Sequence, residues 1–355
     1  MLLKSLINRA TIVNIKGIEE AVFKRSCMSM QECRDIIGKR TITTLGYGPQ
    51  GRNQSLNLRD NGFNIILGLR KGTSWEKAIQ DGWIPNVNLF GTDEATYRGD
   101  IIQYLLSDAG QIEMWPTVRA NLDTNDTLYF SHGFGIVYKN QTNIIPPKFV
   151  DVILAAPKGP GGMLRDKYIL SNRESGINSS IAVYQNHSGK AELDALALAF
   201  GIGSLNIFET TFEKEVYSDL TGERCVLMGL IQGAFRAQFD TLRNHGHSPI
   251  EAFNETVEEA LVSLYPIIND KGMDWMYRNC STTAQRGAID WSEHFYELIK
   301  PSIEECYQRV KSGSETKRVI ECNKAHDYRN SLEKELLAID SQEIWQAGKA
   351  VRNLR

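Results

Sequence analysis

The chain carries the stretch Thr41-Ile42-Thr43-Thr44-Leu45-Gly46-Tyr47-Gly48-Pro49-Gln50-Gly51, which predicts a strand that runs into a glycine-rich turn. A helix is expected next, at residues 53–61, followed by a second strand at residues 63–69. In this strand–turn–helix setting, the spacing G-x-G-x-x-G lets the backbone approach a pyrophosphate at the start of the helix. The stretch therefore predicts dinucleotide binding, with a purely structural glycine turn as the alternative.

The residues that follow the second strand bear on which dinucleotide binds. Proteins that bind NAD usually place an acidic residue there for the ribose 2′-hydroxyl. This chain has Arg70, Lys71, Gly72, Thr73 and Ser74 instead. A guanidinium, an ammonium and hydroxyls suit a 2′-phosphate, so the loop favours NADP(H) over NAD(H). A solvated basic turn is the alternative.

Short apolar strands continue to alternate with helices beyond this loop, which predicts a doubly wound parallel sheet. The strands are expected at residues 100–106, 127–132, 151–158, 181–184 and 205–208. Ligands of such sheets bind at the carboxyl ends of the strands, where His132 and Lys158 fall. The alternatives are that His132 caps a strand turn and that Lys158 is a surface charge. We expect this α/β domain to span residues 1–209 and to begin with an arm and a helix at residues 30–37.

Beyond residue 210 the pattern becomes helical, so residues 210–355 are expected to form an all-α domain. The helices are expected at residues 215–244, 248–269, 273–277, 292–311 and 328–352. Two carboxylate pairs have helical i,i+4 spacing, Asp219 with Glu223 and Glu255 with Glu259. Each pair projects from one helix face, and four such carboxylates can hold hard divalent cations such as Mg²⁺. A solvated acidic face is the alternative.

Composition excludes several classes of protein. The 355 residues are 42% hydrophobic and 23% charged with a net charge of −3, which gives no reason to expect a nucleic-acid partner. Six scattered cysteines indicate reduced thiols. No apolar run approaches the roughly 20 residues that span a bilayer. Residues 1–10 are interpreted as an ordinary arm of a cytoplasmic bacterial protein; the alternative is a targeting remnant and an organelle matrix.

Taken together, these motifs resemble the ketol-acid reductoisomerase family in its short form, with one helical carboxylate domain. The resemblance covers nearly the whole chain and rests on residues 45–51, 56–62, 105–108, 130–134, 156–161, 215–223, 246–259 and 280–287. It implies a Rossmann-like domain followed by a knotted helical domain. It also implies a homodimer, or a larger oligomer, with an active site shared between subunits.

The resemblance assigns roles to particular residues. The metal ligands for two Mg²⁺ ions would be Asp219, Glu223, Glu255 and Glu259. His132 and Lys158 would be active-site residues, Ser281 would contact substrate, and Glu223, Glu259 or a metal-bound water would move protons. The dinucleotide would be held by Gly46, Tyr47, Gly48, Pro49, Gln50, Gly51, Arg70, Ser74, Asp108, Gln111 and Gly161.

The implied reaction is an alkyl migration in 2-acetolactate or 2-aceto-2-hydroxybutyrate, followed by reduction to the 2,3-dihydroxy acid in valine, isoleucine and leucine biosynthesis. NADPH is the expected reductant and NADH the alternative. Two other interpretations fit a nucleotide-binding domain joined to a helical one. A β-hydroxyacid dehydrogenase would need no metal, and in a non-catalytic dinucleotide-binding scaffold the acidic pairs would be mere surface.

Overall fold

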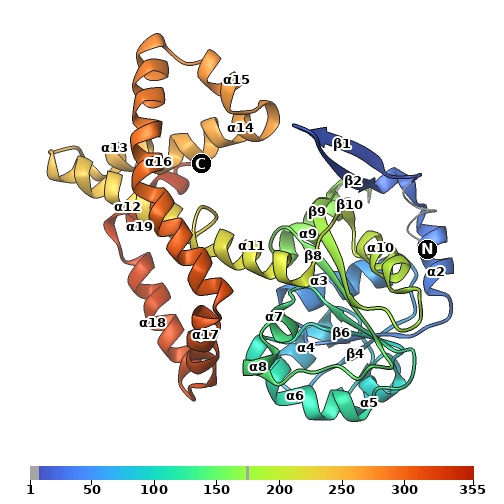
Figure 1. Cartoon of the computed structure of the whole chain (residues 1–355). Coiled ribbons are helices and arrows are strands. Elements are labelled where there is room, and N and C mark those ends of the chain that lie inside the picture. Colours follow the sequence, from blue (N-terminus) through green and yellow to red (C-terminus); the bar gives the residue numbers. More distant parts are fainter. Residues whose placement is uncertain (1–7, 173–175) are drawn as a thin grey trace. The chain divides into compact units, whose positions relative to one another are not determined.

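A computed structural model describes residues 8–172 and 176–355 of the chain (Figure 1). The chain divides into two compact units, Met1–Val216 and Tyr217–Arg355. The sequence placed the end of the α/β domain at residue 209, whereas the division falls inside helix α11 (Phe212–Arg224). The first turns of α11 belong with the sheet because Phe212 packs in one of its cores, and Val216 is fully buried near Gly133, just after β7.

The first unit is built on a ten-stranded mixed sheet. Its strand order is β1-β2-β10-β9-β8-β7-β6-β3-β4-β5. The strands are β1 (Thr11–Ile15), β2 (Ile18–Lys24), β3 (Ile42–Leu45), β4 (Ile65–Gly68), β5 (Leu89–Phe90), β6 (Ile101–Tyr104), β7 (Thr127–Phe130), β8 (Asp151–Pro157), β9 (Ile177–Gln185) and β10 (Ser204–Glu209). The run from β5 to β8 is parallel throughout. Its order is that of a doubly wound dinucleotide-binding sheet, with the crevice expected between the ends of β3 and β6.

Helices cover both faces of this sheet, so its central strands are buried on both sides (Figure 1). One core includes residues of α2 (Met30–Ile37), α3 (Pro49–Asp60), α9 (Gly161–Leu170) and α10 (Ala191–Gly201). The opposite core includes residues of α5 (Thr92–Arg98), α6 (Asp108–Ala120) and α7 (Phe134–Val137). Burial on both faces explains why the central strands are mostly apolar and carry no charged residue between β3 and β7.

The N-terminal segment differs from the expected arm. Residues 11–24 form a β-hairpin in which Ile15 pairs with Ile18, and β2 then pairs antiparallel with β10. Its two-residue turn has positive φ at both Lys16 (50°) and Gly17 (88°), which is the backbone of a type I′ turn. The hairpin therefore extends the sheet on the side away from β5. The helix expected at residues 30–37 is present as α2.

The second unit is helical, as predicted. It contains α12 (Gly229–Asn244), α13 (Pro249–Phe253), two π-helical segments (Asn254–Glu258 and Ala260–Leu264), α14 (Tyr265–Lys271), α15 (Met273–Arg278), α16 (Thr282–Lys311), α17 (Ser314–Lys324), α18 (Tyr328–Asp340) and α19 (Glu343–Arg352). Its small core joins α12 and α13 to α19 through Phe239, Phe253 and Ile344. In the described residues, no helix is both long and apolar enough to cross a membrane.

Several helix boundaries differ from those expected. The helix predicted at 215–244 is interrupted between Arg224 and Gly229, and the one predicted at 328–352 is interrupted after Asp340. Helix α16 begins ten residues earlier than predicted, after Ser281. The helix predicted at 248–269 widens into π turns just before Pro266, whose ring removes an amide donor and crowds the preceding turn.

Candidate functional site

The glycine-rich turn between β3 and α3 is shaped by two close backbone approaches. Gly46 has a φ of 99°, and a Cβ there would lie 2.6 Å from the carbonyl oxygen of Leu105. At Gly51 a Cβ would lie 2.2 Å from the carbonyl oxygen of Gly46. By contrast, a Cβ on Gly48 would meet nothing within 4 Å. The turn is thus packed tightly on its inner side and open at Gly48, beside the first residue of α3.

The side chains of Tyr47 and Gln50 brace this turn. The buried Tyr47 hydroxyl donates to Asp81 Oδ2 at 2.8 Å and accepts from Trp83 Nε1 at 2.9 Å. Burial raises the pKa of Tyr47, so the phenol stays protonated. Gln50 Nε2 donates to the carbonyl oxygen of Gly159 at 3.1 Å. Of these residues, it is chiefly the backbone that remains to contact a ligand.

Three further residues expected at the dinucleotide lie near strand ends. Gly161 begins α9, where a Cβ would lie 2.0 Å from the carbonyl oxygen of Pro49, so α9 and α3 start side by side. Gln111 is buried, and its Nε2 donates to the carbonyl oxygens of Tyr104 and Leu106 at 3.1 Å each. Asp108 begins α6 after the N-cap Ser107. Burial raises the pKa of Asp108, and the nearby His132 partly offsets that rise.

Beyond β4, Arg70 and Lys71 line a cavity of about 700 Å³ together with Trp75 and Met114. Ser74 is exposed in the first turn of α4 (Thr73–Gln80). The loop predicted to read the ribose 2′ position therefore borders a hollow beside the switch point of the sheet.

His132 and Lys158 follow neighbouring strands, β7 and β8, and both reach Glu215 on α11. Lys158 Nζ lies 2.8 Å from Glu215 Oε1, and His132 Nδ1 lies 3.6 Å from Glu215 Oε2. The side chain of Glu215 is only 2% exposed, whereas those of His132 and Lys158 are 27% and 37% exposed. A buried carboxylate is thus placed between two more accessible basic groups.

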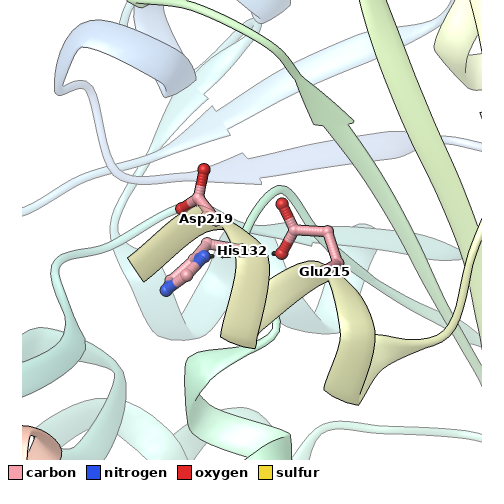
Figure 2. A group of neighbouring side chains, drawn as sticks. All are labelled: His132, Glu215 and Asp219. Carbon is pink, nitrogen blue, oxygen red and sulfur yellow. Dashed lines mark ion pairs between the residues drawn. The ribbon is translucent and has the colours of Figure 1, made fainter. Parts of the chain in front are cut away.

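Asp219 lies one turn after Glu215 on the same helix. Figure 2 shows the His132 ring against the side of α11 that carries both carboxylates. One potential ligand atom from each of His132, Glu215 and Asp219 lies within 4.8 Å of the others. Across the part of the chain that the structure describes, this is the one such group of three or more.

The remaining predicted metal and substrate residues are all on helical elements. Glu223 is half-exposed near the end of α11, with its Oε2 3.7 Å from Arg224 Nη1. Glu255 lies in the first π-helical segment, Glu259 directly follows it, and both side chains are exposed. Ser281 caps α16 by accepting from the amide of Ala284 at 3.2 Å. None of these four belongs to the group around His132, as far as the described residues go.

Sequence reasoning assigned no role to Glu215. The signal was nonetheless available, because Glu215, Asp219 and Glu223 repeat at i,i+4 spacing. Three carboxylates on one helix face repel one another, so a positively charged group is expected near them. That group is Lys158, which lies 57 residues away in sequence, so only the tertiary fold identifies it.

The fold and the cluster together define a class, the nicotinamide-dinucleotide-dependent oxidoreductases that join a Rossmann-like domain to a helical one. Within that class, two family models match. "Acetohydroxy acid isomeroreductase, NADPH-binding domain" matches residues 36–207, and "Ketol-acid reductoisomerase, C-terminal domain" matches residues 212–355. The chain belongs to the ketol-acid reductoisomerase family.

Individual relatives agree. The chain is 54% identical to the ketol-acid reductoisomerase (NAD(+)) of Desulfosudis oleivorans, over 97% of each chain. It is also 54% identical to the mitochondrial ketol-acid reductoisomerase of Neurospora crassa, over 97% of this chain and 85% of that protein. The solved structure of an NADH-preferring ketol-acid reductoisomerase from an uncultured archaeon superposes with a TM-score of 0.80 at 30% identity, covering 94% of this chain and 99% of that one.

These findings confirm the fold class, the family and the enzyme function expected from the sequence. The chain is a ketol-acid reductoisomerase of branched-chain amino-acid biosynthesis that uses a nicotinamide dinucleotide.

Proposed function

We propose that the chain converts 2-acetolactate and 2-aceto-2-hydroxybutyrate in a site centred on His132, Lys158 and α11. The observation that supports this site most is the buried Glu215, which gathers Lys158 and His132 at the ends of β7 and β8. Ligands of doubly wound sheets bind at these strand ends, so the hydride donor and the substrate would meet there.

Two Mg²⁺ ions fit the donor set. Asp219 and Glu223 offer carboxylate oxygens one turn apart on α11, and Glu255 and Glu259 offer a second pair, four residues apart, in and just after the π-helical segment Asn254–Glu258. Hard divalent cations prefer such oxygen ligands. When bound, the metal supplies Lewis-acid stabilisation of negative charge on substrate oxygens. We assign these four residues as its ligands and Ser281 as a substrate contact.

The protein's own groups position the reacting molecule. Glu215 holds the Lys158 ammonium by an ion pair of 2.8 Å, which leaves the other ammonium protons to donate to a substrate oxygen. His132 is held on the other oxygen of the same carboxylate. We assign His132 and Lys158 as catalytic residues and Glu215 as their positioning residue. Glu223 and Glu259 remain the candidates for moving protons.

For the reductant, Arg70, Lys71 and Ser74 support NADPH, as the loop sequence suggests. NADH is the second candidate, because the guanidinium of Arg70 pairs with the carboxylate of Glu113, Nη1 to Oε1, at 3.0 Å. That pairing leaves less positive charge for a 2′-phosphate. The remaining dinucleotide contacts assigned here come from the turn at residues 46–51, Asp108, Gln111 and Gly161.

A homodimer is proposed from the apolar surface of the helical unit. Trp291, Phe295 and Leu298 share one face of α16 and are 58%, 51% and 60% exposed. Large exposed apolar patches mark interaction sites, and a second copy of the chain would cover this one. As for localisation, the mitochondrial name of the Neurospora relative supports an organelle matrix over the bacterial cytoplasm.

The reaction is tested with the purified full chain, 2-acetolactate and either NADPH or NADH, by following loss of the reduced nicotinamide. We expect turnover only with Mg²⁺, its abolition by EDTA, and unchanged dinucleotide binding after chelation. Asp219→Asn should abolish turnover in the same way. Turnover that persists in EDTA would contradict the metal site and favour a metal-independent hydroxyacid dehydrogenase.

A further inference from the structure

The cavity beyond β4 is lined by three segments that are distant in sequence, and one of them is residues 85–92. Arg70 and Lys71 follow β4, and Met114 reaches the cavity from α6. Glu113, the neighbour of Met114 on α6, does not itself line the cavity but pairs with Arg70, which does. The basic loop thus faces an acidic group that does not belong to the loop.

This ion pair contributes little to the stability of the fold. The side chains of Arg70 and Glu113 are 69% and 60% exposed. Exposed pairs contribute little to folding, because water and salt screen them. Both side chains are therefore able to rearrange around a bound ligand at small cost. Their effect on the binding of a charged ligand is thus more important than their effect on folding.

We propose that Glu113 is a specificity-determining residue that shifts the enzyme's preference from NADPH toward NADH. The inference rests on the proposed function, in which Arg70, Lys71 and Ser74 contact the dinucleotide, so that the cavity that their loop borders receives its adenosine half. Arg70 and Lys71 carry two positive charges, and Glu113 neutralises one of them at a distance of 3.0 Å. A 2′-phosphate, which carries about −1.5 to −2 charges, then meets a site of reduced positive charge.

For a dinucleotide with a 2′-hydroxyl, by contrast, Glu113 favours binding. A carboxylate accepts hydrogen bonds from a ribose hydroxyl, which is the role that an acidic residue at the end of the second strand has in many NAD-binding proteins. In this chain that strand end carries Arg70, and the acidic group arrives from α6 instead. Glu113 thus supplies the chemistry that the loop sequence itself lacks.

The test replaces the charge and keeps the shape with Glu113→Gln. The ratio of kcat/KM for NADPH to kcat/KM for NADH should rise roughly tenfold, because removing one charge near a phosphate changes its binding by that order. Most of the change should lie in the KM for NADPH and should shrink at high salt. The matched control is Glu94→Gln, which removes a carboxylate from the exposed Glu94–Arg98 pair of α5 and should leave the ratio unchanged.

A binding measurement separates this inference from the proposed function. Adenosine 2′,5′-bisphosphate and AMP are titrated calorimetrically into wild-type and Glu113→Gln enzyme, with no turnover involved. The variant should bind the bisphosphate roughly tenfold more tightly and AMP no more tightly. A wild-type chain that binds neither nucleotide overturns the proposed dinucleotide site together with this inference. A chain that binds both with a ratio changed less than twofold by the substitution overturns the inference alone.

Discussion

Glu215 is a carboxylate that is almost fully buried, yet it contacts groups that remain open to solvent. The attraction of the Lys158 ammonium offsets the cost of removing its charge from water, since an unpaired charge at such a position is strongly unfavourable. Glu215 in turn positions its partners, because it fixes two flexible basic side chains at one point.

Replacing that anion should therefore affect catalysis more than folding. For Glu215→Gln we expect kcat to fall roughly 100-fold or more, since a preorganised charge at a reaction centre is worth about that much. The melting temperature should fall only modestly, because the Lys158 ammonium can turn to water. Glu213→Gln, on the exposed side of the same helix, is the control. A Glu215→Gln enzyme with wild-type kcat would contradict the positioning role.

A second buried acid should make stability depend on pH. Asp126 is 8% exposed just before β7, and burial raises its pKa from 3.8 to about 7. The raised pKa favours the protonated acid in the folded state. The contribution of Asp126 to the free energy of unfolding is therefore complete below about pH 4 and is lost as the pH rises through about 7. The loss is up to roughly 4 kcal/mol.

Asp126→Asn should remove this dependence. The amide keeps an oxygen that can accept from the amide of Asp123, which now donates to Asp126 Oδ2 at 2.7 Å. Unfolding midpoints measured between pH 4 and 8 should decline for the wild type and stay flatter for the variant, which should be the more stable protein at pH 8. Parallel curves for the two proteins would show that Asp126 ionises freely.

At the scale of elements, the central strands could be predicted from the sequence because burial on both faces makes them mostly apolar, with only small or uncharged polar residues such as Thr43, Thr44 and Gln103 between. The β1–β2 hairpin could not. All five residues of β1 are exposed, so no alternation of apolar and polar side chains marks it. Its turn, Lys16-Gly17, was the available local signal. Helix ends were also imprecise, since the π turns before Pro266 depend on local backbone geometry that periodicity does not report.

Some residues of the candidate site could also be predicted from the sequence, and others could not. His132 and Lys158 could be predicted because they stand at strand ends, where position in sequence implies position in space. The inward direction of the Tyr47 side chain depends on Asp81 and Trp83, so the sequence motif could not reveal it. Glu215 and Glu113 were missed for a related reason. Each matters through a partner distant in sequence, and such pairs follow from tertiary packing alone.

For the whole molecule, the exposed apolar face of α16 predicts association. Phe295→Asp combined with Leu298→Asp should convert the dimer to a monomer in light scattering, because two charges would have to be buried in the interface. Activity should fall with dimer content if subunits share the site. Gln308→Asp, which places a charge on another face of α16, should leave the dimer intact. A wild-type chain that is monomeric at all concentrations would contradict this assignment.

The number of residues between the carboxylates of α11 determines which face of the helix each one occupies. Glu215 and Asp219 face His132 together because four residues of an α-helix turn through slightly more than a full circle. Inserting or deleting one residue between them would rotate Asp219 by about 100° and separate the two carboxylates onto different faces. The segment from 215 to 223 should thus tolerate exchanges at its outward positions but no change in length. Anyone redesigning this enzyme can vary what α11 displays there, provided that the count of residues is kept.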